Sequence, residues 1–164
     1  DKEEDVFSRK NPLVHFTASS WIINKSRDKV LLCFHNIYNS WSWLGGHCDN
    51  EIDCLKVAIK EAKEESGLDE FRCISDGIFS MESLCVNSHI KKGENISSHI
   101  HINLTYLLEA DDTKSLKVKE DENKGLMWAP IEDIYKLSNE PWFVEHVYKK
   151  LNEKLYKLIK ENKI

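Results

Sequence analysis

Three glutamates stand where a helix would bring their carboxylates together. Glu61, Glu64 and Glu65 are spaced i, i+3 and i+4, and a turn of about 100° per residue places them within an arc of about 100°. Clustered like charges destabilise a helix unless a counter-ion neutralises them. A hard divalent cation would do so, because Mg²⁺ prefers carboxylate oxygens together with water and phosphate. Taken alone, such a run is more typical of a solvated helix surface, so the flanking residues decide the interpretation.

The flanking residues extend the pattern. The chain reads Gly46-x5-Ile52-x7-Lys60-Glu61-Ala62-x-Glu64-Glu65-x-Gly67-Leu68. This stretch resembles the Nudix box of the Nudix hydrolases, G-x5-E-x7-R-E-U-x-E-E-x-G-U, where U is a bulky aliphatic residue. The strictly matching positions are Gly46, Glu61, Glu64, Glu65, Gly67 and Leu68. A looser resemblance covers residues 13–160, including Trp128-Ala129-Pro130, which is similar to the family's late strand.

Two departures bear on activity. Lys60 replaces the arginine that orients a neighbouring carboxylate in the family, and lysine lacks the planar fork for that task. The chain is poor in arginine throughout, so drift in composition explains this change. Ile52 replaces the first glutamate of the box, and Glu51 would substitute only through a one-residue loop insertion. That glutamate is less central in the family than the later cluster, so the resemblance still implies catalysis.

The resemblance implies a fold and a reaction. The fold is α/β, a Nudix-type α/β/α sandwich with a mixed central sheet and a long C-terminal helix. The reaction is hydrolysis of a nucleoside diphosphate linked to another moiety, with Mg²⁺, or alternatively Mn²⁺, neutralising the pyrophosphate and activating water. The implied substrate is a small nucleotide-type molecule.

The resemblance also implies roles for particular residues. The expected catalytic residues are Glu61, Glu64, Glu65 and Lys60. The expected metal ligands are the carbonyl of Gly46, the carboxylates of Glu61, Glu64 and Glu65, and a further carboxylate from the loop at 119–123, where Glu122 is favoured over Glu120. The general base is one of these carboxylates, and the sequence leaves open which one.

Substrate contacts are expected near the glycines and on an aromatic strand. His47 and Lys60 are candidates for phosphate contacts. Trp41 and Trp43 share one strand face and are candidates for stacking on a base, although an aromatic residue in a strand is more often part of the core.

Histidines and a cysteine offer two further patterns. His99 and His101 share a strand face, but no cysteine or third histidine completes a metal-binding set, so a polar cleft wall or a structural role is favoured. Cys48 beside His47 resembles a nucleophilic pair only superficially, because adjacent loop residues seldom face each other.

The elements that must position these residues follow from periodicity. Apolar residues at helical spacing predict a helix from Asp53 to Ser66, with Asp53 as N-cap, Ile52 and Val57 as a hydrophobic staple, and Gly67 as the stop. Strands are expected at 13–23, 29–34, 41–44, 71–90 and 98–109, with a polar loop at 91–95. A short helix is expected at 131–137, followed by a long amphipathic helix from Pro141 to about residue 162.

Length and composition bound the remaining alternatives. The 164 residues fit an exposed lead-in at 1–12 and one domain at 13–164. No apolar run is long enough to cross a bilayer. The net charge of -5 disfavours a general nucleic-acid binder. The five cysteines contain no Cys-x-x-Cys pair, which favours free thiols in a reducing cytoplasm.

Three functions therefore compete. A Nudix-type pyrophosphohydrolase is favoured, as a monomer or homodimer. A Nudix-fold nucleotide-binding or sensor domain without catalysis is the second, and Ile52 is its main support. An RNA 5′-end pyrophosphohydrolase is the third, and the acidic charge counts against it.

Overall fold

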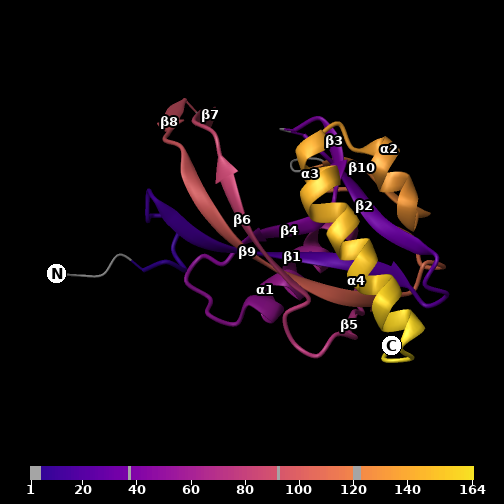
Figure 1. The fold of residues 1–164 in the computed structure, drawn as a ribbon. Coiled ribbons are helices and arrows are strands. Elements are labelled where there is room, and N and C mark those ends of the chain that lie inside the picture. The colour runs from indigo at the N-terminus through magenta and orange to yellow at the C-terminus, as the bar shows by residue number, and fades with distance from the viewer. Residues whose placement is uncertain (1–4, 37, 92, 120–122) are drawn as a thin grey trace.

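A mixed β-sheet lies between helices in the computed structural model, which describes residues 5–36, 38–91, 93–119 and 123–164 (Figure 1). Within these residues the main sheet has eight strands in the order β10-β2-β1-β9-β5, with β3 paired to β2, β4 to β1 and β6 to β9. The strands are β1 (Val14–Asn24), β2 (Lys29–His35), β3 (Ser40–Ser42), β4 (Leu44–His47), β5 (Arg72–Cys73), β6 (Ser80–Val86), β7 (His89–Lys91), β8 (Glu94–Ile96), β9 (His99–Ala110) and β10 (Asn123–Pro130). The helical segments are α1 (Cys54–Ser66), η1 (Ile131–Asp133), α2 (Ile134–Leu137), α3 (Pro141–Phe143), η2 (Val144–Tyr148) and α4 (Lys149–Lys160).

The centre of the sheet is a parallel pair. β1 and β9 run side by side from Val14 opposite Ile100 to Asn24 opposite Ala110, while the other pairings in this sheet are antiparallel. Both strands are largely buried because helices cover the two sheet faces. The expected mixed central sheet is confirmed.

Alternating side chains of β1 divide the interior into two cores. Ala18 and Ile22 belong to the core on the α1 side, whereas Trp21 and Ile23 pack with α4 residues on the other. Figure 1 shows the long C-terminal helix crossing the sheet face opposite α1. The expected sandwich architecture is therefore confirmed.

The C-terminal helix begins at Pro141, as predicted, and ends at Lys160. Its second segment, η2, is a π-helical turn. Val147, Leu151 and Leu155 are buried against the sheet of the same chain, so the apolar stripe packs on the core. No helix in the described ranges has the length and apolar character needed to cross a membrane.

Two expected strands and one expected loop need correction. The strand predicted at 71–90 is split into β5 and β6, because a turn at Ser75–Gly77, with Gly77 at φ 79°, interrupts it. The loop predicted at 91–95 contains the turn of the β7–β8 hairpin, where Gly93 has φ 84°. The strand predicted at 41–44 changes partner after Ser42, since β3 pairs with β2 and β4 pairs with β1.

The described part of the lead-in is not simply exposed. Ser8 and Asn11 are buried, and Phe7 stacks on Phe16 of β1 with ring centroids 4.8 Å apart. Arg9 forms an ion pair with Asp49, in the loop after β4. These contacts attach the segment to the strands that carry the candidate site.

Candidate active site

Local capping fixes the position of α1. The Asp53 side chain accepts a hydrogen bond from the Lys56 N–H at 3.1 Å, and Gly67 ends the helix at φ 73° with its N–H donating to the Lys63 carbonyl. Both caps agree with the sequence prediction. They set where the helix begins and ends, and therefore which way the three glutamates face.

Glu61 lies against Gly46 of β4. A Cβ atom added at Gly46 would lie 2.6 Å from Glu61 Cδ and 2.8 Å from Oε2, so the Glu61 carboxylate could keep its present position only beside a glycine and would otherwise have to shift. The Glu61 side chain is mostly buried. The structure thus brings together two of the residues that the resemblance implies as metal ligands.

Glu65 is held by the neighbouring glycine. Its Oε2 atom accepts the Gly45 N–H at 3.0 Å, and the residue is 5% exposed. Gly45 is equally close-packed, since an added Cβ would lie 2.5 Å from the Ala18 carbonyl oxygen. Two consecutive glycines therefore allow two glutamates of α1 to contact the same strand.

Glu64 is the most accessible of the three carboxylates. It forms ion pairs with Lys60 at 3.4 Å and Lys119 at 3.7 Å, and its side chain is 42% exposed. Lys60 also approaches Glu61 at 3.2 Å. Burial acts to lower the pKa of Lys60, but hydrogen bonds and charges from Glu61 and Glu64 outweigh it and raise the pKa.

The donor set fits a hard divalent cation. Carboxylate oxygens beside a strand-end backbone are the ligands that Mg²⁺ prefers, and the glycine cradle at Gly46 keeps the Glu61 carboxylate at this position. Lys60 and Lys119 offset part of the negative charge of Glu64.

The predicted fifth metal ligand, Glu122, and its alternative, Glu120, lie outside the described residues. Both flanks of that segment contact the end of α1. Lys119 pairs with Glu64, and the Asn123 side-chain N–H donates to the Glu65 carbonyl at 3.4 Å.

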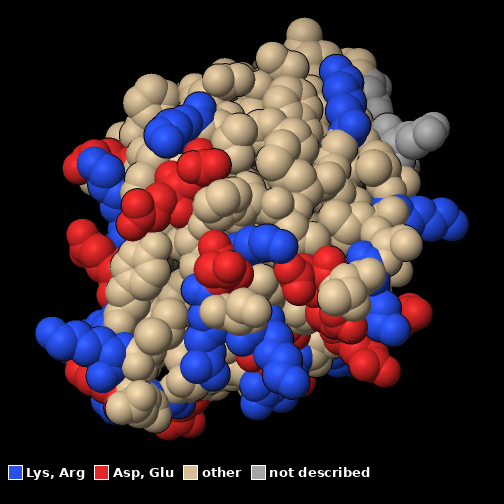
Figure 2. All heavy atoms as spheres, turned by 90° about the vertical axis from the view of Figure 1, so that its right-hand side faces the viewer, with Lys and Arg blue, Asp and Glu red and all other residues tan. Residues whose placement is uncertain are grey.

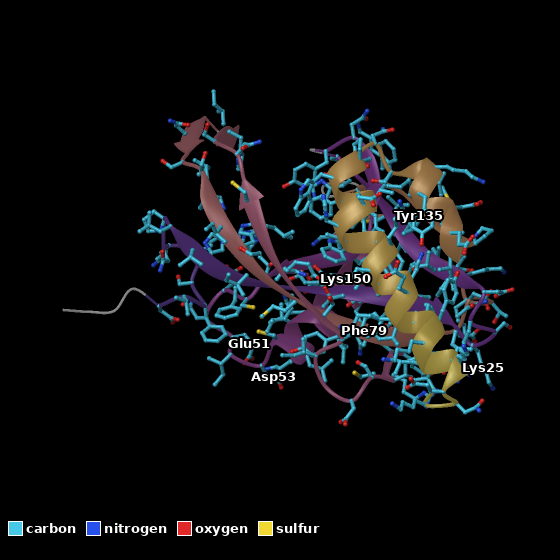
Figure 3. The ribbon with its side chains drawn as sticks, viewed as in Figure 1. Lys25, Glu51, Asp53, Phe79, Tyr135 and Lys150 are labelled. Atoms are coloured by element: carbon cyan, nitrogen blue, oxygen red, sulfur yellow. The ribbon has the colours of Figure 1, made fainter. Side chains whose placement is uncertain are left out.

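Ile52 does not form the predicted staple with Val57. Ile52 is 74% exposed, whereas Val57 is buried. The preceding loop has two left-handed residues, Asp49 at φ 49° and Asn50 at φ 73°, which turn the chain before Ile52. Glu51 pairs with Lys56 and accepts the Asp53 N–H, and Figure 3 shows Glu51 and Asp53 near the start of α1.

The predicted stacking residues are half-buried. Trp41 meets Phe34 edge-on at 5.3 Å between ring centroids, and Trp43 meets Phe143 edge-on at 6.1 Å. Both tryptophans pack against the core cluster on the α4 side, so they share one environment as expected. Their role in binding a base stays a prediction.

His47 and Cys48 behave differently from a reactive pair. Burial lowers the pKa of His47 to about 3, so its imidazole is a neutral hydrogen-bonding group rather than a cationic phosphate contact. Burial raises the pKa of Cys48 to about 12, which keeps it a thiol, and its Sγ lies 3.5 Å from Cys54 Sγ. These findings agree with rejecting a nucleophilic pair.

The expectation that no third histidine joins His99 and His101 is wrong. His15 of β1 and His47 of β4 lie beside them, with ring centroids 4.7 Å and 5.0 Å from His101. Sequence spacing gave no signal for this cluster, because it depends on the parallel pairing of β1 with β9. The sequence did offer one signal, because polar residues alternate in both strands and such alternation indicates a polar sheet face.

Charge is mixed on the side of the molecule that lies to the right in Figure 1. Figure 2 shows blue and red side chains interspersed over the lower half of this face, below a largely uncharged upper part. No single-sign field that would attract a nucleic-acid backbone is visible on this face.

Comparison with known proteins identifies the family and the fold. A model of the NUDIX domain matches residues 14–151. An Ap4A hydrolase from C. elegans, solved as a binary complex, is 20% identical, with a TM-score of 0.60 over 89% of this chain and 98% of that chain. A NUDIX-family hydrolase from Clostridium perfringens is 23% identical, with a TM-score of 0.59 over 88% and 97%. The MutT protein of Methanosarcina mazei is 14% identical, with a TM-score of 0.60 over 85% and 93%. No curated protein matches the chain.

The chain belongs to the Nudix family. The structural likenesses agree in fold over most of the chain. The expected enzyme class, a hydrolase acting on phosphoanhydride bonds, follows from this membership.

Proposed function

We propose that the protein is a Mg²⁺-dependent pyrophosphohydrolase that cleaves a nucleoside diphosphate linked to another moiety. The observation that carries this proposal is the contact of Glu61 with Gly46, beside the buried Glu65 and the accessible Glu64. Mn²⁺ is the alternative cation. We also propose that the protein acts in the cytoplasm, in agreement with five free cysteines in the structure.

The three glutamates differ in burial, and their proposed roles follow from this difference. Glu61 and Glu65 are fixed against β4 and would hold the cation together with the Gly46 carbonyl. Bound Mg²⁺ would neutralise the pyrophosphate and activate the attacking water. Glu64 is proposed as general base because it is the carboxylate most open to solvent. Water adds to one phosphorus, the anhydride P–O bond breaks, and two phosphate-bearing products leave.

Lys60 and the tryptophans have supporting roles in this proposal. Lys60 lies between Glu61 and Glu64 and would hold their orientation or contact a substrate phosphate. Trp41 and Trp43 would stack on the base where their edges remain accessible. His47 would act as a neutral hydrogen-bonding group beside Gly46.

The test is product release from a substrate panel. Dinucleoside polyphosphates, nucleoside triphosphates, ADP-ribose and nucleotide sugars are each assayed with Mg²⁺, with Mn²⁺ and with chelator. Turnover of one class is expected only with metal, and Glu64→Gln is expected to lower kcat by about 10²–10⁴-fold. Glu153→Gln, at an exposed position of α4, is the matched control and should retain full activity.

Ile52 favours one competing function. An exposed aliphatic side chain stands where the family's first box glutamate would be, which is expected of a binding or sensor domain that has lost catalysis. In that case no compound on the panel turns over, while one of them still raises the melting temperature.

A further inference from the structure

Four histidines from three strands lie together at one end of the sheet. In the parallel pair, His15 of β1 stands beside His101 of β9, and the antiparallel pairing of β4 places His47 opposite Thr17. His99 shares a face with His101 because strand side chains alternate. The His15 ring lies 4.7 Å from His101, 4.9 Å from His99 and 5.2 Å from His47 between centroids.

The ring nitrogens also converge. One ligand nitrogen from each of His15, His47 and His101 lies within 4.8 Å of the others. The Nε2 atoms of His99 and His101 are 3.0 Å apart and share a hydrogen bond, whose proton a bound cation would replace. Two nitrogens bound to one tetrahedral Zn²⁺ at the usual bond length are about 3.3 Å apart. One pair therefore already has the spacing of ligands, and modest side-chain rotation would close the remaining distances.

Hydrogen bonds fix the protonated nitrogen in two of the rings. His15 Nδ1 bonds to the Asn11 carbonyl at 3.1 Å, and His99 Nδ1 bonds to the Ser97 carbonyl at 2.8 Å. A carbonyl only accepts, so Nδ1 carries a hydrogen in both rings, and Nε2 is the nitrogen whose lone pair is available in the neutral imidazole. Metal-binding histidines are typically oriented by such an outer hydrogen bond to a backbone carbonyl.

His15 supplies the observation that points to a ligand. The residue is 4% exposed, and its Nε2 has no hydrogen-bond partner among the described residues. Buried polar atoms are nearly always paired. The ring is in contact with the other three histidines, so the unpaired nitrogen belongs to a group of imidazoles. A cation held in common by these rings would satisfy it.

The type of donor selects the cation. Imidazole nitrogens suit Zn²⁺, Cu²⁺ and Ni²⁺, whereas Mg²⁺ takes oxygen ligands. The nearby carboxylate of Asp49 is paired with Arg9. We propose that His15, His47, His99 and His101 form a binding site for a transition-metal ion of the Zn²⁺ class.

This site uses different ligands from the carboxylate site, although His47 and Lys60 line one cavity together with Asp49. Gly46 faces Glu61 of α1, and His47 is the next residue of β4, so its side chain points to the opposite face of the strand. A bound ion would connect β1, β4 and β9 and would hold the strand end that carries Gly46. The proposal does not depend on the hydrolase activity, since binding is measured without any substrate.

The test is titration of the tag-free, metal-stripped chain. Isothermal titration with Zn²⁺ is expected to show one ion bound per chain, and Co²⁺ is expected to give the visible absorption of a tetrahedral site. Mg²⁺ is the negative probe. His101→Gln is expected to weaken Zn²⁺ binding at least about tenfold. The matched control, His146→Gln at an exposed position of η2, should bind as the unaltered chain does.

A second measurement uses the unaltered chain, so the test stays valid if the His101 variant does not fold. In the unaltered chain, ¹⁵N spectra of the imidazoles should show Zn²⁺-dependent shifts at the Nε2 atoms of His15 and His99. His47→Gln provides a further substitution at a half-buried position. The proposal is overturned if the imidazole signals do not move, or if Zn²⁺ binding survives the histidine substitutions and is lost in Glu61→Gln.

Discussion

The two faces of β4 carry two kinds of polar site. On the α1 side, Gly46 meets a cluster of charged carboxylates that lysines partly neutralise. On the other side, His47 joins a cluster of largely buried imidazoles. Adjacent residues of one strand therefore face oxygen donors on one side and nitrogen donors on the other. If both proposals hold, strand alternation would keep two cation sites of different donor type apart within a small domain.

The largest expected effect separates the two faces directly. Glu61→Gln keeps the shape of the side chain but removes its charge, so metal-dependent hydrolysis should fall by about 10²-fold or more. Zn²⁺ titration of the same variant should match that of the unaltered chain. Steady-state kinetics and calorimetry on one preparation test both statements. Loss of Zn²⁺ binding in parallel with activity would mean that the two faces form a single site.

Gly46→Ala tests whether close approach is what builds the carboxylate face. The added Cβ would lie 2.6 Å from Glu61 Cδ, so Glu61 must move, and the free energy of unfolding should fall by about 1–3 kcal/mol. Hydrolysis should fall as well. Gly125→Ala is the control, because its nearest neighbour would be Trp41 Cη2 at 3.3 Å, a contact that a small shift relieves. Chemical denaturation measures both variants, and equal destabilisation would contradict the close-approach argument.

Lys150→Met tests the polar layer beside the histidines. Lys150 of α4 points toward the sheet (Figure 3) and binds the buried Glu82 at 2.8 Å. Glu82 also accepts hydrogen bonds from Asn103 and Thr105. Removing the ammonium group should lower the free energy of unfolding by about 1–3 kcal/mol at neutral pH.

The same pair predicts a pH dependence. Burial acts to raise the pKa of Glu82, but its hydrogen bonds to Lys150 and neighbouring side chains outweigh this and lower it. A lowered carboxyl pKa stabilises the fold above the ordinary value of 4.5, and this stabilisation is lost as pH falls through the lower folded value. The difference between Lys150→Met and the unaltered chain should shrink below pH 4.5 in thermal unfolding. A difference that stays constant with pH would exclude the ion pair as its cause.

The smallest expected effect concerns Lys60. The Lys60 side chain is 61% exposed in its pairs with Glu61 and Glu64, so Lys60→Met should lower kcat/KM by about 2–5-fold. Lys60→Arg restores the residue expected from the family pattern and should keep full activity, because the guanidinium supplies a planar fork. A loss above a hundredfold in Lys60→Met would instead indicate direct contact with the reacting phosphate.

Local sequence patterns predicted the ends of α1 but did not predict the histidine cluster. The ends of α1 followed from Asp53 and Gly67 because caps act within a single turn. The staple failed because left-handed residues in the preceding loop direct Ile52 outward, a backbone feature that hydropathy does not encode. The histidine cluster was missed because His15 and His101 become neighbours only through the register of a parallel pair. Residues 120–122, where a further metal ligand was predicted, lie outside the described ranges.

The parallel pairing of β1 with β9 also has a kinetic consequence. The carboxylate face needs only α1 and the nearby β4, whereas the histidine face must wait until a strand from the second half of the chain reaches β1. Closing that long loop is slow because its entropy is lost before the pairing is gained. During refolding, amide protection should therefore develop in α1 before it develops in β9. Formation of the histidine cluster would then indicate that β9 has paired with β1.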